Sequence, residues 1–290
     1  MKLLNFIQNN EVKLGIELEN GVLDVNKYKD LISDKTPRTM EEAIESGKES
    51  LEKLVKNLDD NVELIKIQDI KYAPVITNPE KILCVGLNYK SHREETKTTF
   101  KKEDDYPVLF SKFKNALAAN LEDIPLIEED VKYDYEAEMV IVIGKEGKNI
   151  EKEKVSDYIF GYTVGNDISA RTLQRRSGQW LIGKSIDKFA PVGPVIVTAD
   201  VINASNLDIK CEVNGKVVQD SNTKNLIYDI ETIVSYASKF MTLKPGDIIF
   251  TGTPGGVILG MPEEKQVWLK PGDKMSVTIE NIGTLINTLK

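Results

Sequence analysis

The sequence contains one histidine, His92, and two cysteines, Cys84 and Cys211, in 290 residues. A single imidazole excludes metal sites built from two or three histidines. Two cysteines far apart in the chain exclude a disulfide framework and a cysteine-rich zinc site. A metal bound here would have to be held by carboxylates, which are the ligands of Mg²⁺, Mn²⁺ and Ca²⁺.

The sequence also lacks surplus positive charge and long apolar runs. Its 38 Lys and Arg residues face 46 Asp and Glu residues, for a net charge of −8. A nucleic-acid partner is not expected, because a phosphate backbone attracts clustered cations. No run approaches the roughly 20 apolar residues that cross a bilayer, and the apolar start is too short for a signal peptide. We therefore expect a cytoplasmic protein without membrane contact.

The first part of the chain differs in pattern from the rest. Short apolar stretches separated by Asn and Gly over residues 1–30 predict a small antiparallel sheet. Thr39 and Glu42 form a capping-box signature, and apolar residues at helical spacing follow. The composition becomes richer in strand-like runs between residues 70 and 80. We predict a small N-terminal α+β domain, 1–74, and a larger domain, 75–290.

The larger part reads mainly as β structure, so the predicted fold class is α+β, mainly β. Strand-like runs occupy residues 81–87, 136–144, 158–165, 193–199, 207–215, 246–252 and 274–283. One clear helix is predicted over 226–241 from its three- and four-residue apolar spacing. The pentapeptide Leu-Lys-Pro-Gly-Asp occurs at 243–247 and 269–273, and predicts turns that lead into strands.

Three carboxylates stand out by their position. Glu136 and Glu138 open an apolar strand at positions i and i+2, so both project from one face. Neighbouring like charges favour a divalent cation between them, although a solvated strand end is the alternative interpretation. Asp167 ends a later apolar run, where it could also be a helix N-cap. Arg171 and Gln174 follow Asp167 at i+4 and i+7, so a helix would place them on one face.

His92 and Glu95 follow another strand at helical spacing i, i+3. A carboxylate beside an imidazole fixes its tautomer and raises its basicity, as a general base requires. An ordinary surface histidine is the alternative. The charged stretch that begins here predicts a mobile lid over residues 92–106.

Two glycine-containing segments are candidates for ligand binding. Residues 178–185 match the G-x-x-x-x-G-K-S phosphate-binding pattern, but no buried strand precedes them and two prolines follow, so we reject nucleotide binding there. Lys184 could still point into a site. Residues 251–256 could bind a substrate carboxylate through backbone N–H groups, or simply form a tight turn.

Taken together, these segments resemble the fumarylacetoacetate hydrolase family, in its bacterial acylpyruvase and 2-hydroxyhepta-2,4-diene-1,7-dioate isomerase branch. The resemblance runs in order over residues 78–290, through GLNYKSHREE, PVLFSK, DYEAEMVIVIG, GYTVGNDISARTLQ, QWLIGKSID and LKPGDIIFTGTPGGV. It implies a mixed β-sandwich roll for the larger domain, a small accessory N-terminal domain, and a homodimer.

The resemblance also implies roles for individual residues. The metal ligands for Mg²⁺ or Mn²⁺, with Ca²⁺ as an alternative, would be Glu136, Glu138 and Asp167. The catalytic residues would be His92, Glu95 and Lys184. The substrate-binding residues would be Lys112, Arg171, Gln174 and Thr253.

The implied activity is hydrolytic C–C cleavage of acylpyruvate-type 2-oxo or 1,3-diketo acids through a metal-bound enolate. Isomerisation or decarboxylation of 2-hydroxy-dienedioates or oxaloacetate is an open alternative within the family. An alternative of another class is an inactive, metal-stabilised binding protein. That alternative predicts loss of the His92–Glu95 pair, and both residues are present.

Overall fold

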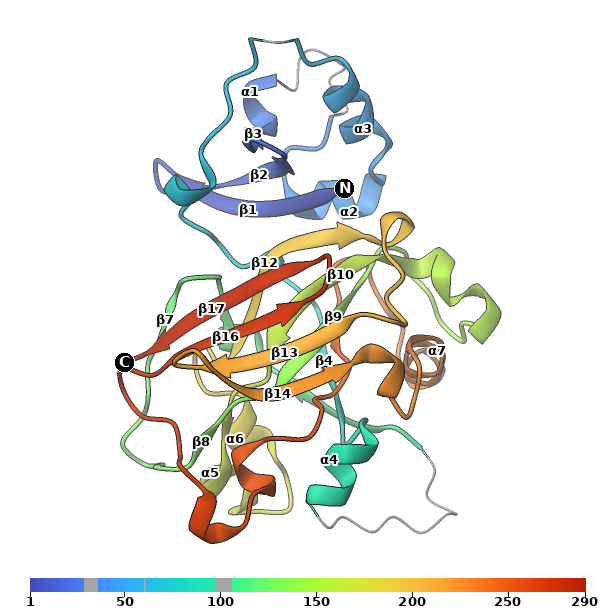
Figure 1. The fold of residues 1–290 in the computed structure, drawn as a ribbon. Helices are drawn as coiled ribbons and strands as arrows, with labels where there is room; N and C mark the ends of the chain where they lie inside the picture. Colours follow the sequence, from blue (N-terminus) through green and yellow to red (C-terminus); the bar gives the residue numbers. More distant parts are fainter. Residues whose placement is uncertain (29–35, 60, 97–105) are drawn as a thin grey trace.

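The computed structural model describes residues 1–28, 36–59, 61–96 and 106–290 (Figure 1). A ten-stranded sheet runs through the molecule, and a five-stranded sheet packs against its central strands β9, β10 and β12. This sandwich of mixed sheets, with few helices, agrees with the expected mainly β fold. In Figure 1 the N-terminal segment forms a separate lobe above the sandwich.

The ten-stranded sheet has the order β3-β2-β1-β12-β10-β9-β15-β4-β5, with β6 paired to β12. Its strands are β1 (Lys2–Gln8), β2 (Glu11–Leu18), β3 (Gly21–Asp24), β4 (Ile82–Gly86), β5 (Val108–Lys112), β6 (Leu117–Ala118), β9 (Ala137–Ile143), β10 (Ile159–Asn166), β12 (Ala190–Thr198) and β15 (Ile248–Phe250). The expected N-terminal meander is confirmed, because β1, β2 and β3 pair antiparallel in sequence order. Strand β1 also pairs with β12, so the sheet continues from the first residues into the larger part of the chain. The division at residue 74 stays a prediction.

The five-stranded sheet has the order β14-β13-β16-β17-β7, and β8 and β11 form a separate pair. These strands are β7 (Asp123–Ile124), β8 (Tyr133–Asp134), β11 (Ser169–Ala170), β13 (Asp208–Val213), β14 (Lys216–Asn222), β16 (Lys274–Ile279) and β17 (Gly283–Leu289). Asn214 and Gly215, both with positive φ, form the tight turn between β13 and β14. That turn favours Asn-Gly, because the left-handed region strains most other residues.

The helices are short and lie around the sheets. They are α1 (Val25–Tyr28), α2 (Met40–Ser46), α3 (Glu49–Lys56), α4 (Lys90–Glu95), α5 (Arg171–Arg175), α6 (Leu181–Lys184) and α7 (Ile230–Phe240). Short 3₁₀ helices occupy Ile67–Asp69, Lys114–Ala116, Lys152–Tyr158, Ala199–Val201, Thr223–Asn225, Ile258–Gly260 and Glu263–Lys265. Among the described helices, none has the length and apolar character needed to cross a membrane.

Helix boundaries follow capping groups. Thr39 accepts a hydrogen bond from the Glu42 backbone N–H and caps α2, as predicted. The helix expected from residue 226 instead begins at Ile230, because the Asp229 side chain caps it by accepting from Thr232 N at 2.7 Å. Ile227 lies outside the helix, where its N–H donates to the Asn88 carbonyl.

The two Leu-Lys-Pro-Gly-Asp segments form the same turn, as expected. Asp247 accepts from the backbone N–H of Lys244 at 2.7 Å, and Asp273 accepts from that of Lys270 at 2.9 Å. Each turn leads directly into a strand, β15 or β16.

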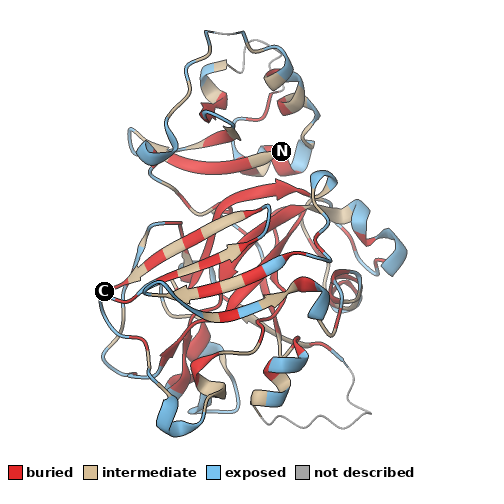
Figure 2. Ribbon diagram, in the orientation of Figure 1, coloured by how far each residue is buried: buried red, intermediate tan, exposed pale blue. Residues whose placement is uncertain are grey.

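Strand β9 is buried along its whole length, as Figure 2 shows for the centre of the sandwich. Met139 and Ile141 belong to the core between the two sheets, whereas Val140 and Val142 belong to a second core on the opposite face. Because side chains alternate along a strand, Glu138 projects from the same face as Val140. A carboxylate is thereby directed into a buried region of the fold.

Candidate active site

Neighbouring strands bring the three acids together. Glu136 directly precedes β9, Glu138 lies within it, and Asp167 directly follows β10. Strands β9 and β10 are antiparallel, and residue 166 pairs with residue 137, so the end of one strand lies beside the start of the other. All three carboxylates are buried, and one oxygen from each lies within 4.8 Å of the others.

Buried cations contact two of these acids. Lys184 Nζ lies 2.7 Å from Glu136 Oε2 and 2.6 Å from Asp167 Oδ2. Arg171 Nη2 lies 2.7 Å from Glu136 Oε1, and Lys112 forms an ion pair with Asp167. Burial opposes ionisation of Glu136, but Lys184 and Arg171 outweigh it and hold the pKa of this carboxyl well below its usual range.

Glu138 is the exception in the triad. Among the described residues, no lysine, arginine or histidine forms an ion pair with it, and its Oε2 accepts a hydrogen bond from Gly252 N at 2.6 Å. Burial, together with the charges of Asp167 and Glu136, raises the pKa of Glu138 well above its usual range. A divalent cation would supply the missing positive charge, and three carboxylates are the hard oxygen ligands that Mg²⁺, Mn²⁺ or Ca²⁺ prefer. The residues present therefore fit such an ion.

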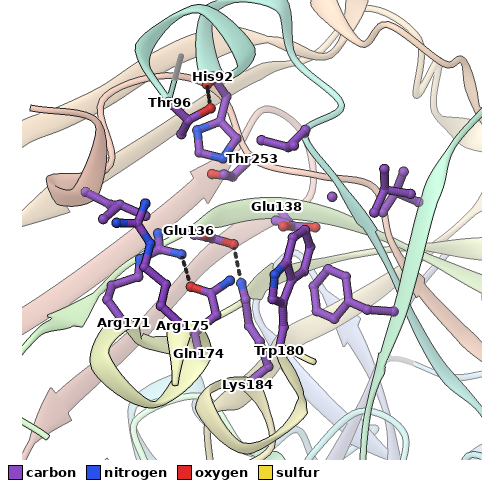
Figure 3. Close-up of a pocket in the computed structure, with 16 residues that line it drawn as sticks. His92, Thr96, Glu136, Glu138, Arg171, Gln174, Arg175, Trp180, Lys184 and Thr253 are labelled. Carbon is purple, nitrogen blue, oxygen red and sulfur yellow. Dashed lines mark hydrogen bonds and ion pairs between the residues drawn. The ribbon is translucent and has the colours of Figure 1, made fainter. Parts of the chain in front are cut away.

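The imidazole of His92 lies across the cavity from Lys184 (Figure 3). It projects from α4, and its Nδ1 is 2.8 Å from Glu95 Oε1. Glu95 Oε2 in turn accepts a hydrogen bond from Gly256 N at 2.7 Å. A carboxylate on Nδ1 favours the tautomer whose Nε2 carries the lone pair, so Nε2 can accept a proton.

Glu136, Glu138 and the imidazole border one cavity of about 350 Å³. Its lining consists of Val85, Gly86, Leu87, His92, Thr96, Val108, Phe110, Glu136, Glu138, Arg171, Gln174, Arg175, Trp180, Lys184, Thr253 and Leu259. Trp180 packs edge-on against Phe110, with ring centroids 5.3 Å apart, and forms an apolar wall. In Figure 3 Trp180 lies opposite Arg171, Gln174 and Arg175 of α5.

Two neutral side chains retain donors for a ligand. Gln174 Oε1 accepts from Arg171 Nη1 at 3.0 Å, which leaves the amide NH₂ of Gln174 for the cavity. Thr253 Oγ1 accepts from Gln219 Nε2 at 2.8 Å, which leaves the hydroxyl hydrogen of Thr253 to donate elsewhere.

All ten residues singled out in the sequence lie in or directly behind this cavity. Those that line it are His92, Glu136, Glu138, Arg171, Gln174, Lys184 and Thr253. Those behind it are Glu95, Lys112 and Asp167, each in contact with another member of the set. Their chemical roles stay predictions.

Three interpretations of local pattern need correction. Asp167 is neither a helix N-cap nor part of the helix with Arg171, because α5 begins at Arg171 after the short strand β11. The N–H groups of Gly252, Gly255 and Gly256 are not left for a substrate carboxylate. They donate instead to Glu138, Ser91 and Glu95 of the chain itself.

The rejected phosphate-loop pattern has a structural explanation. A Cβ on Gly183 would lie 2.3 Å from the backbone N of Gln174, so this glycine allows α6 to pack tightly on α5. The adjacent Lys184 is occupied by two carboxylates of the triad. The lid expected over residues 92–106 falls largely on 97–105, which lie outside the described residues.

Sequence reasoning missed two buried polar residues that support the site. Asp134 accepts from Arg171 Nε at 2.9 Å and Nη2 at 2.7 Å, and from Ile258 N at 2.9 Å. Its spacing of two from Glu136 continues the alternation of acids and could have revealed it. Gln219, which contacts Thr253 from β14, carries no comparable sequence signal.

Comparison with known proteins gives consistent matches. Residues 81–290 match the family model described as fumarylacetoacetate (FAA) hydrolase C-terminal. The oxaloacetate tautomerase fahd2, mitochondrial, of Xenopus laevis is 40% identical over 294 residues, covering 99% of this chain and 89% of the relative. Because that name includes a mitochondrial location, the expected cytoplasmic location stays a prediction, as does the homodimer.

Solved structures resemble the whole chain. A fumarylacetoacetate hydrolase from psychrophilic Exiguobacterium antarcticum is 32% identical, with a TM-score of 0.83, and the match covers 100% of this chain and 99% of that one. Maleylpyruvate hydrolase from Sphingobium sp. SYK-6, solved in complex with manganese (II) ion and pyruvate, is 27% identical with a TM-score of 0.80, covering 100% and 98%.

Proposed function

The chain belongs to the fumarylacetoacetate hydrolase family, and we propose that it is a divalent-metal-dependent enzyme that interconverts the keto and enol forms of a 2-oxo acid. One observation carries the proposal: one cavity is lined on one side by Glu136 and Glu138 of a buried carboxylate triad and on the other by a carboxylate-bound imidazole. The relative from Xenopus laevis, named an oxaloacetate tautomerase, favours this reaction over the others considered for the family.

Glu136, Glu138 and Asp167 would hold the cation. Bound there, Mg²⁺ or Mn²⁺ would act as a Lewis acid toward the oxygen of a 2-oxo group. The buried Glu138, which is in no ion pair within the described part of the chain, supports this assignment. The manganese and pyruvate in the maleylpyruvate hydrolase structure support it as well.

His92 would move the proton that distinguishes the two forms. In the direction from keto to enol, Nε2 would take a proton from C3 of the substrate, solvent water would supply a proton to the C2 oxygen, and the imidazolium would release its proton to solvent, so that no net proton is consumed. The reverse direction returns the proton to C3. Glu95 keeps the Nδ1–H in place and stabilises the imidazolium, the usual role of a carboxylate behind a general base.

Lys184 would stabilise negative charge on the C2 oxygen. Burial alone would lower its pKa, but the charges of Asp167 and Glu136 outweigh burial and raise the pKa of Lys184 above its ordinary value. The amine therefore stays protonated and donates hydrogen bonds, so it cannot serve as the base. The amide of Gln174 and the hydroxyl of Thr253 remain as donors to the substrate carboxylate.

Hydrolytic C–C cleavage is the second candidate. The same imidazole could deprotonate a water directed at a distal carbonyl, and one structural neighbour is named a maleylpyruvate hydrolase. The intact His92–Glu95 pair argues against an inactive binding protein.

A substrate panel tests the proposal. Purified protein with Mg²⁺ or Mn²⁺ is assayed for ketonisation of enol-oxaloacetate, decarboxylation of oxaloacetate and cleavage of acylpyruvates, each with and without EDTA. We expect ketonisation to be fastest and to be lost in EDTA. Faster acylpyruvate cleavage would favour the hydrolase, and no activity on any compound would favour the binding protein.

A further inference from the structure

Among the described residues, four lysine and arginine side chains lie in or behind the cavity wall, and three of them form ion pairs with carboxylates of the chain. Lys112 and Lys184 pair with Asp167, and Arg171 pairs with Glu136. All three cations are at most 3% exposed. They neutralise the negative charge of the buried acids. They are therefore not available as the main partners of a second charged group at the far end of a substrate.

Arg175 is the fourth and differs from the others. It lines the cavity, and it lies at i+4 from Arg171 on α5, so the two share a helix face and Arg175 is one turn further along. Arg175 is exposed, and no carboxylate of the described residues forms an ion pair with it. Its guanidinium has five N–H donors in a planar fork that suits a carboxylate.

A second hollow of about 440 Å³ borders the same arginine. It shares Arg171, Arg175 and Leu259 with the active-site cavity. It also contains Lys132, whose Nζ lies 5.7 Å from the centroid of the Trp268 ring, and a single acid, Glu263. Positive charge therefore exceeds negative charge around Arg175, which attracts anions to this side of the site.

The opposite wall is less suited to a carboxylate. It is formed by the rings of Trp180 and Phe110, and of these two side chains only Trp180 has a donor, its single neutral indole N–H. One neutral donor does not compensate the desolvation of a charged group, whereas a guanidinium offers positive charge and several donors. For a substrate whose first carboxylate and 2-oxo group face the acid triad, the wall formed by α5 is therefore the more favourable place for a second carboxylate.

We propose that Arg175 is a specificity-determining residue that binds the second carboxylate of a 2-oxo dicarboxylic acid. This inference rests on the proposed function, since it assumes that a 2-oxo acid occupies the cavity. The preferred substrates are then dicarboxylates, and compounds with a neutral far end, which pack against the Trp180 wall instead, are selected against.

The test compares two substrates with the same four-carbon 2-oxo acid skeleton, oxaloacetate and its 4-ethyl ester, in which the second carboxylate is uncharged. Enol-to-keto conversion of each is measured with Mn²⁺ for the wild type, Arg175→Gln and Arg176→Gln. Arg176 is the matched control, because it is the exposed neighbouring arginine and lines neither hollow.

We expect the wild type to prefer the diacid by about tenfold or more in kcat/KM, the usual effect of a charge-assisted hydrogen bond. This preference should fall at least fivefold in Arg175→Gln, mainly through KM, and less than twofold in Arg176→Gln. The preference of Arg175→Lys for the diacid should lie between those of the wild type and Arg175→Gln, since lysine keeps the charge and loses the planar fork. Thermal melting curves confirm that each variant is folded.

The outcomes separate this inference from the proposed function. If the wild type converts neither compound, the proposed function is wrong and the inference fails with it. If the wild type converts oxaloacetate but shows no preference over the ester, or if Arg175→Gln keeps the preference within fivefold of wild type, only the role of Arg175 is overturned. Equal losses in Arg175→Gln and Arg176→Gln overturn it too.

Discussion

The carboxylate of Glu95 bridges His92 and the loop after β15: Oε1 lies 2.8 Å from His92 Nδ1, and Oε2 accepts from Gly256 N at 2.7 Å. The same loop donates Gly252 N–H to Glu138 at 2.6 Å. One loop therefore contacts Glu138 directly and the imidazole through Glu95. We infer that the geometry between the base and the cation site depends on this loop.

Replacing His92 tests the proposed base. His92→Gln should lower kcat for ketonisation by about 10²–10⁴-fold, the usual contribution of a general acid–base group. Stabilisation of the protein by Mn²⁺ should persist, because His92 is not among the proposed ligands. Lys90→Gln, on the exposed side of α4, is the control. A loss below tenfold would show that another group moves the proton.

A glycine substitution tests the position of Glu95 without altering its chemistry. A Cβ on Gly260 would lie 2.4 Å from Glu95 Cδ and 2.5 Å from Cγ, so Gly260→Ala must displace this side chain. We expect kcat to fall by about 10–100-fold, since small misplacements of catalytic groups have effects of this size. Gly178→Ala is the control, because nothing lies within 4 Å of its Cβ. Similar kcat values for the two variants would contradict the role assigned to Glu95.

Glu138→Gln tests the cation site in a binding experiment that needs no activity. Mn²⁺ should raise the melting temperature of the wild type, because a ligand that binds only the folded state stabilises it. The variant should lose most of this increase, since one of its three carboxylates is gone. Glu231→Gln, on the exposed side of α7, should respond to Mn²⁺ as the wild type does. An undiminished increase in Glu138→Gln would place the ion elsewhere.

The pH dependence of stability without metal tests the environment of Glu138. Its folded pKa lies above the ordinary value of 4.5, so above this pH the unfolded chain releases a proton that the folded chain retains. The free energy of unfolding therefore decreases as pH rises from 4.5 toward the folded pKa. Relative to the wild type, Glu138→Gln should gain stability over this interval, by up to about 1.4 kcal/mol per pH unit.

Urea unfolding in EDTA at pH 5 and pH 8 measures this difference. The free energy of unfolding of Glu138→Gln, relative to that of the wild type, should be higher at pH 8 than at pH 5. A difference that stays constant between the two pH values would mean that Glu138 ionises normally in the folded protein.

The parts of the site that the sequence predicts are those set by local geometry. Strand alternation places Glu136 and Glu138 on one face, and helical spacing places His92 beside Glu95. Both relationships involve residues at most three positions apart. The structure adds that the first pair is buried and that the second pair is held by a distant loop.

Contacts that depend on the packing of distant segments have no local signal. The ion pair of Arg171 with Asp134 joins residues 37 positions apart, and Gln219 reaches Thr253 across 34 positions. For a related reason, the start predicted for α7 from the sequence, residue 226, lies four residues before the observed start at Ile230. Leu226 and Ile227 fit the helical apolar spacing. They pair instead with the segment around Asn88, and these tertiary contacts decide their conformation.

The most direct test of the account is to locate Mn²⁺ and a substrate mimic in crystals of this protein. Anomalous diffraction from crystals soaked in Mn²⁺ and oxalate should give one strong peak among Glu136, Glu138 and Asp167, with oxalate density between that peak and His92. A manganese peak outside the triad, or oxalate bound away from the imidazole, would contradict the account.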